Sequence, residues 1–157
     1  MRTDITKEQA RSKAEAYCAK SEHCEAEIRM KLLDWKVGTS DAEEVVRHLI
    51  DERYIDNHRF AKAFVRDKFR FGSWGKVKIA QHLRAKQIDP SVIEEALDEI
   101  DATAYIDTLR RLLAAKSRNV TAHSEYERNG KLIRFALGRG FEMTDILTCI
   151  PQSDTME

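Results

Sequence analysis

Residues 49–88 read LIDERYIDNHRFAKAFVRDKFRFGSWGKVKIAQHLRAKQI, and this run decides the fold. Apolar side chains recur at three- and four-residue spacing on both sides of the bend Gly72-Ser73-Trp74-Gly75, which is typical of amphipathic helices. Asp56 and Asn57 precede the first stripe, and both residue types favour the N-cap of a helix. The apolar residues are Phe60, Phe64 and Val65 before the bend, and Ile79 and Leu83 after it. The run therefore predicts two helices joined by a sharp turn.

Helix signals continue in both directions from this run. Capping-box patterns occur at Thr6–Gln9 and Ser40–Glu43. Ser21 can cap a further helix, and Asp89 before Pro90 is typical of a helix start. The chain contains no convincing alternating segment and only 6 Gly and 2 Pro, which argues against turn-rich sandwiches and barrels. The expected helices run over 7–19, from Ser21 (with Ile28, Leu32 and Leu33 inside), from Ser40, after Asn57, after Gly75, after Asp89, and over 102–116, 123–137 and 144–150. The sequence predicts an all-α protein of nine helices.

These helices fall into threes. Apolar positions match at an offset of 51 and then of 53, and the aligned sets are Ile28, Leu32 and Val37; Ile79, Leu83 and Ile88; and Leu132, Ala136 and Phe141. A unit of this size buries little surface alone, so neighbouring units must pack on one another. We therefore expect three tandem three-helix repeats at 1–55, 56–100 and 101–157, in an elongated, curved arrangement. The alternative is that any helical chain yields such coincidences.

Charge is strongly segregated although Lys and Arg (27) equal Asp and Glu (27) in number. Residues 58–86 contain nine basic side chains and the single acid Asp67, whereas residues 87–107 contain seven acids and neither Lys nor Arg. The basic block is suited to phosphates or to an acidic protein surface. In the other interpretation, the acidic helix packs beside the basic ones and neutralises them. The two interpretations are compatible, since part of the block can be neutralised.

Aromatic residues run through the same basic block. The four-residue spacing of Phe60 and Phe64 predicts core positions. Phe71 and Trp74 flank Gly72 at the bend, where the spacing leaves the role of Phe71 open and Trp74 either covers the corner of the core or contacts a partner. Cys18, His23 and Cys24 lie close in sequence but lack the second Cys/His pair of a zinc site.

No catalytic constellation and no glycine-rich phosphate loop can be singled out in the 157 residues, so we expect neither enzymatic activity nor a cofactor. Three cysteines are too few and odd in number for a disulfide framework. No signal peptide or membrane-length apolar run is present. We therefore expect a soluble cytoplasmic protein, without membrane contact and monomeric.

The run Tyr54-Ile55-Asp56-Asn57-His58-Arg59-Phe60-Ala61 resembles the signature that opens the central repeat of the RecX regulatory proteins. The continuation from Gly72 to Ile79 is similar to the next helix of that family. The resemblance implies three tandem three-helix repeats, binding to the RecA recombinase filament on DNA, and restraint of its ATP hydrolysis and strand exchange without catalysis. One departure is Arg53, where the family usually has glycine, so the third helix is expected either to end without the usual left-handed glycine cap or to end elsewhere.

The candidate contact residues lie in the basic block, and they would bridge filament protein and DNA phosphate. They are Arg59, Arg66, Lys68, Arg70, Trp74, Lys76, Lys78, Arg84 and Lys86. Arg59 can instead pair with a nearby acid such as Asp56, because a cation is disfavoured near a helix start. The alternative function is a helical nucleic-acid-binding module that acts directly on DNA through residues 58–86, with the helix after Gly75 as its recognition helix.

Overall fold

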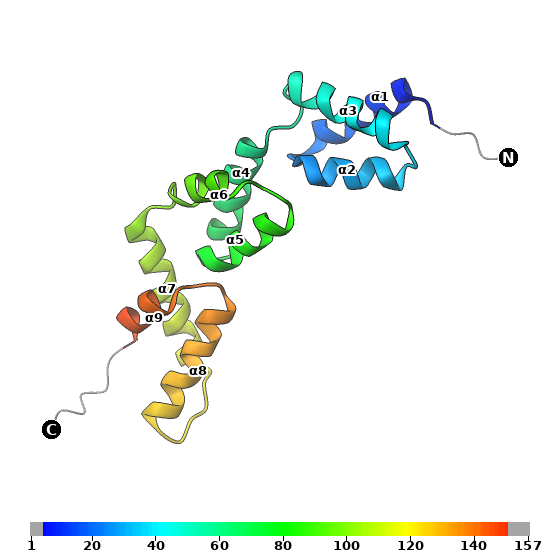
Figure 1. The fold of residues 1–157 in the computed structure, drawn as a ribbon. Coiled ribbons are helices and arrows are strands. Elements are labelled where there is room, and N and C mark those ends of the chain that lie inside the picture. Colours follow the sequence, from blue (N-terminus) through cyan, green and yellow to red (C-terminus); the bar gives the residue numbers. More distant parts are fainter. Residues whose placement is uncertain (1–4, 151–157) are drawn as a thin grey trace. The chain divides into compact units, whose positions relative to one another are not determined.

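The structure is a computed structural model that describes residues 5–150. Over this range it contains helices and turns but no strand, which confirms the all-α prediction. The nine helices of residues 5–150 are α1 (Lys7–Lys20), α2 (Glu25–Asp34), α3 (Thr39–Asp51), α4 (Asn57–Arg70), α5 (Lys76–Ala85), α6 (Pro90–Leu97), α7 (Ala102–Ser117), α8 (Glu125–Gly138) and α9 (Met143–Cys149). Figure 1 shows α1, α2 and α3 packed together and, separately, α7, α8 and α9 packed together.

The chain forms two compact units. Unit 1 contains the residues up to Ala63 together with Leu83–Glu94, and unit 2 contains Phe64–His82 together with the residues from Glu95 onward. The core of unit 1 is built from α1–α3 and the segment after α3: Ala10, Ala14, Ile28, Leu32, Val37, Val45, Val46, Leu49 and Ile55. The core of unit 2 is built around α7–α9: Tyr105, Leu109, Leu113, Leu132, Ala136, Phe141, Ile146 and Ile150. Leu33, expected on the inner face of α2, is instead 65% exposed.

The end of the middle helix has the same geometry three times. After α2, α5 and α8 the chain turns through one residue with positive φ, and these residues are Lys36, Gln87 and Gly140. In each case the next residue is apolar, is buried, and donates its N–H to the carbonyl of the residue five positions earlier. This pair of features is the Schellman motif. The three turns are separated by 51 and 53 residues, which confirms the repeat spacing predicted from the sequence.

Helix α3 ends in the same motif, with an arginine where glycine is favoured. Arg53 has φ 62°, its N–H donates to the carbonyl of Ile50, and the N–H of Tyr54 donates to the carbonyl of Leu49. The left-handed cap is therefore retained, although its usual residue is not. The cost falls on Arg53, because a side chain with a Cβ is strained in this conformation.

Two of the predicted helix starts are wrong. Thr6 and Gln9 form the expected capping box at the start of α1. Helix α2, however, begins after Cys24, whereas Ser21 lies outside it, with its Oγ 3.1 Å from Nε2 of His23. Helix α3 begins after Gly38, so Ser40 is already inside the helix. Both serines have side chains that can cap a helix, but Cys24 and Gly38 occupy the positions directly before the two helices.

Candidate partner-binding surface

The corner between α4 and α5 is held by backbone hydrogen bonds to the last turn of α4. The N–H groups of Gly72 and Trp74 both donate to the carbonyl of Lys68, at 3.1 and 3.0 Å. A Cβ at Gly72 would lie 2.8 Å from that carbonyl oxygen and 3.0 Å from the Trp74 ring. Only glycine fits there, so the indole can lie directly over the end of α4. Ser73 completes the turn with φ 52°.

Trp74 is the centre of a cluster of cations and rings within unit 2. The ammonium nitrogens of Lys68 and Lys78 lie 4.9 and 4.3 Å from the centroid of its ring, which is cation–π distance. Phe64 meets the indole edge-on at 6.3 Å, and the ring of His82 lies 4.7 Å away. Trp74 is half-buried and packs at the corner, and whether it also contacts a partner stays a prediction. The cluster holds two lysine side chains that would otherwise be free to move.

The first turn of α5 is fixed by backbone groups from the end of α8, also in unit 2. The N–H of Gly75 donates to the carbonyl of Arg139 at 2.8 Å, and the N–H of Val77 donates to the carbonyl of Gly140 at 2.9 Å. The backbone at Gly75 and the backbone at Gly140 approach so closely that a Cβ at Gly75 would lie 2.2 Å from the carbonyl carbon of Gly140. The guanidinium of Arg139 also donates to the carbonyl of Gly72 at 2.6 Å. The corner that carries Trp74 is therefore rigid.

Lys76 takes part in this junction through its backbone and its side chain. Its N–H donates to the hydroxyl of Tyr105 at 2.8 Å, and that hydroxyl donates to Oε1 of Glu142 at 2.6 Å. Burial and the hydrogen bond to Glu142 raise the pKa of Tyr105 far above its usual value, so the phenol stays protonated. The ammonium of Lys76 lies 4.8 Å from the centre of the Tyr105 ring. Lys76 is thus mainly a packing residue of the junction.

Arg59 belongs to unit 1 and is held by structural partners. Its Nε lies 2.9 and 2.8 Å from the two carboxylate oxygens of Glu22, and its Nη2 donates to the carbonyls of Arg53 and Tyr54. The expected partner, Asp56, instead caps α4 by accepting the N–H groups of His58 and Arg59. These backbone hydrogen bonds lower the pKa of Asp56.

Lys86 is also paired within unit 1. Its ammonium lies 2.7 Å from Oε2 of Glu27, and both side chains are about 30% exposed or less. Burial alone would raise the pKa of Glu27, but hydrogen bonds from Lys86, the Cys24 N–H and His23 outweigh it, so that its pKa is lowered. At least part of the basic block is therefore neutralised by acids of α2 and the residues before it.

Three of the predicted arginines extend into solvent. Arg70 and Arg84 are exposed, and Arg66 is 58% exposed, with only its neighbour Asp67 at 3.9 Å. The nine predicted residues therefore divide into structural ion pairs (Arg59, Lys86), a junction residue (Lys76), the Trp74 cluster (Lys68, Lys78) and exposed cations. Arg59, Arg84 and Lys86 lie in unit 1, and the other six lie in unit 2.

Sequence reasoning missed two features of this region. The acids that pair with Arg59 and Lys86 lie 37 and 59 residues away along the chain, and no local pattern marks them. The second feature is the 80% exposure of Phe71, whose role the sequence left open.

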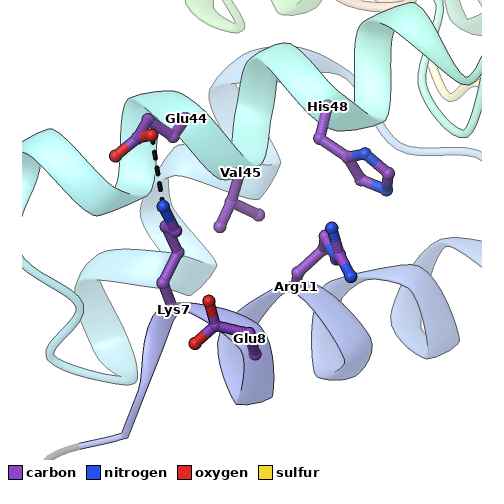
Figure 2. Close-up of a pocket in the computed structure, with 6 residues that line it drawn as sticks. All are labelled: Lys7, Glu8, Arg11, Glu44, Val45 and His48. Atoms are coloured by element: carbon purple, nitrogen blue, oxygen red, sulfur yellow. Dashed lines mark hydrogen bonds and ion pairs between the residues drawn. The ribbon is translucent and has the colours of Figure 1, made fainter.

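Elsewhere in unit 1, a shallow hollow lies between α1 and α3, lined by Lys7, Glu8, Arg11, Glu44, Val45 and His48 (Figure 2). Lys7 pairs with Glu44 at 3.2 Å, and Nε2 of His48 lies 2.6 Å from Glu15. The hollow is therefore lined by two acidic and two basic side chains, whereas the Trp74 cluster contains lysines without a paired carboxylate among the described residues. Among residues 5–150, no group of His, Cys, Asp and Glu side chains has an arrangement that could hold a metal ion. Within the same range, no helix is both long and apolar enough to span a membrane.

Comparison with family models gives two matches. Residues 56–97 match the model described as RecX, second three-helix domain, and residues 103–150 match the model described as RecX, third three-helix domain. Among individual proteins, the chain is 30% identical over 149 residues to the regulatory protein RecX of Halorhodospira halophila, covering 94% of this chain and 89% of that protein. It is 30% identical over 128 residues to the regulatory protein RecX of Pelodictyon phaeoclathratiforme, covering 82% and 78%.

Two other relatives are longer. The chain spans 65% of the regulatory protein RecX of Clostridium acetobutylicum, at 30% identity, and 49% of that of Oceanobacillus iheyensis, at 27% identity. Among solved structures, it is similar to RecX from Lactobacillus salivarius, with TM-score 0.83, 21% identity, and 91% of this chain and 93% of that chain covered. A crystal structure of a regulatory protein RecX gives TM-score 0.81 and 23% identity, over 91% and 72% of the two chains. These structures support the same repeat fold.

Proposed function

This chain belongs to the RecX family of regulatory proteins, and from that premise we propose that it binds the RecA–DNA filament and restrains filament ATP hydrolysis and strand exchange. It acts as a binding protein in recombination and DNA repair, without chemistry of its own. The observation that carries the proposal is the match of residues 56–97 to the family's second domain, because this segment contains the basic corner. A cytoplasmic location and the monomeric state remain predictions.

The contact surface that we propose is smaller than the basic block. Arg59 and Lys86 are engaged in ion pairs with Glu22 and Glu27, so their charges are already compensated. Lys76 is occupied at the junction with Tyr105. The cations that remain for a partner are Arg66, Lys68, Arg70 and Lys78 in unit 2 and, separately, Arg84 in unit 1. Exposed cations contribute to the electrostatic steering and specificity of an interface, and substitutions at exposed surface positions usually change stability by no more than about 0.5 kcal/mol.

The test is the rate of ATP hydrolysis by RecA on single-stranded DNA as this protein is titrated in. Changing Arg66, Arg70 and Arg84 together to Glu should raise the concentration needed for inhibition about tenfold or more, because like-charge contacts at an interface cost several kcal/mol. The matched control changes three exposed cations outside the block to Glu, which alters net charge equally: Arg11, Lys36 and Arg118. Equal weakening by both triple variants would mean that only net charge matters, and would refute the proposed surface.

A second function rests on the Trp74 cluster, whose two lysines could bind DNA without any filament. A parallel titration of bare DNA separates the two functions. Inhibition at concentrations far below those that bind bare DNA supports regulation of the filament. Absence of inhibition, with tight and salt-sensitive binding to bare DNA, supports the nucleic-acid-binding module instead.

A further inference from the structure

We propose that the corner between α4 and α5 is a binding site for single-stranded DNA, in which Phe71 stacks on a base and Lys68 and Lys78 contact the flanking phosphates. The choice of DNA as the nucleic acid rests on the proposed function. The site itself is inferred from the exposure, charge and rigidity of the corner within unit 2.

Phe71 is the first observation. Its ring is 80% exposed, although it directly follows α4 and precedes a half-buried tryptophan. The backbone that carries it is fixed: its N–H donates to the carbonyl of Asp67 at 2.9 Å, and the carbonyl of the next residue, Gly72, accepts the 2.6 Å hydrogen bond from Arg139. A large ring held in solvent on rigid backbone can bind a planar partner at little cost in conformational entropy. Bases stack on such rings without sequence preference.

The charge around Phe71 is the second observation. Residues 66–78 contain five cations and one acid. Within residues 5–150, the ammonium groups of Lys68 and Lys78 make no ion pair with a carboxylate, and both are held against the ring of Trp74. Their distances to the ring centroid place the two nitrogens no more than about 9 Å apart. Two neighbouring cations without an anion between them favour a ligand that brings negative charge, as a phosphodiester backbone does.

Tyr126 provides an internal comparison. It is 90% exposed and also lies in unit 2, but its neighbours in the first turn of α8 are Glu125 and Glu127. An aromatic ring between two carboxylates repels a phosphate backbone. The two exposed rings therefore differ in charge environment and not in exposure, which makes Tyr126 the matched control for Phe71.

The experiment measures binding of fluorescently labelled oligo(dT), and of a DNA duplex of equal length, by fluorescence anisotropy at several salt concentrations. We expect Phe71→Ala to weaken oligo(dT) binding about tenfold, with duplex binding changed by less than about twofold, because only unpaired bases can stack. Phe71→Trp should retain binding, and Tyr126→Ala should have no effect. Circular dichroism checks that each variant is folded.

Replacing the lysines should change the salt dependence of DNA binding. Lys68→Gln and Lys78→Gln should each make the slope of log K against log salt shallower by about 0.7, the value for one phosphate contact on a single strand, whereas Phe71→Ala should leave the slope unchanged. Lys13→Gln is the control, because Lys13 makes the same kind of contact, 4.5 Å from the centroid of the Trp35 ring in unit 1.

Several results would overturn the site: no oligo(dT) binding by the wild-type protein at low salt, unchanged affinity in Phe71→Ala, or an equal loss on duplex. A Phe71→Ala variant that binds oligo(dT) normally but inhibits RecA less would reassign the ring to a protein contact. Because the binding assay contains no RecA, its failure leaves the proposed regulation of the filament standing. Conversely, a protein that fails to inhibit RecA can still pass this test.

Discussion

Replacing Arg53 with glycine tests how much strain the end of α3 contains. A residue with a Cβ in the left-handed region costs about 1–2 kcal/mol relative to glycine, and Arg53 has φ 62°. The greater freedom of glycine in the unfolded chain offsets about 0.4–1 kcal/mol of this gain in stability. Loss of a cation near the C-terminus of α3 costs about 0.3 kcal/mol. We therefore expect Arg53→Gly to be more stable than the wild type by about 0.5 kcal/mol.

The substitution leaves the other contacts of this turn in place. The N–H of Arg53 donates to Ile50, and its carbonyl accepts from Arg59, and both groups belong to the backbone. The Arg53 side chain is exposed. Gln87→Gly is the companion variant, because Gln87 has φ 62° in the same motif but carries no charge. Without the helix-dipole cost, its gain should be about 0.8 kcal/mol.

The assay is urea unfolding, with tryptophan fluorescence as the readout. The chain has two tryptophans, one in each unit, so a Trp74→Phe background leaves Trp35 as the reporter of unit 1. The midpoint should rise in both glycine variants while the m value stays constant, since the surface exposed on unfolding is unchanged. An unchanged or lower midpoint in Arg53→Gly, with a constant m value, would refute the strain argument.

The two remaining predictions concern a close backbone contact and an ion pair. Gly75→Ala should destabilise unit 2 by about 3 kcal/mol or more, because its Cβ would lie 2.2 Å from Gly140, whereas Gly138→Ala, with open space around its Cβ, should be neutral or stabilising. Thermal unfolding of both variants checks this, and equal stability would contradict it. Glu27 has a lowered pKa, so its stabilising contribution is present above about pH 4.5 and is lost as pH falls through its pKa in the folded protein. Lys86→Gln should remove roughly 1 kcal/mol at neutral pH and flatten the acid limb of the curve of stability against pH, and parallel limbs would show that the pair is not coupled.

The repeat could be predicted from the sequence because it depends on apolar spacing alone. The match of Val37 with Ile88, and of Ile88 with Phe141, marked the residue that follows each left-handed turn, although the turns themselves were not foreseen. Burial of these three side chains imposes the pattern, so it survives in the sequence. The exact helix starts were less predictable, because Ser21 and Ser40 have the right side chains for caps but the wrong surroundings.

The candidate surface could be predicted only in outline. The basic block was visible in the sequence, but which of its cations are occupied depends on contacts with distant acids. Glu22 forms an ion pair with Arg59, and Glu27 forms one with Lys86. The sequence near either acid does not indicate these pairs. The exposure of Phe71 likewise follows from the turn at Gly72, whose geometry is set by packing with α8.

Two middle helices, α2 and α5, have the N–H of their first residue bound by a side chain from a later helix. The N–H of Glu25, first in α2, is bound by the side chain of Asn57 from α4, and the N–H of Lys76, first in α5, is bound by the hydroxyl of Tyr105 from α7. In both cases the acceptor comes from the first turn of the next repeat, and the two donors are 51 residues apart. By contrast, α8 is capped by its own Ser124, which accepts the N–H of Glu127. The start of α2 also has a local contact, because the N–H of Cys24 donates to Oε1 of Glu27 at 3.2 Å, whereas the residue before α5 is Gly75, which has no side chain to act as a cap. The Glu25–Asn57 contact thus fixes the start of α2 within unit 1, and the Lys76–Tyr105 contact fixes the start of α5 within unit 2.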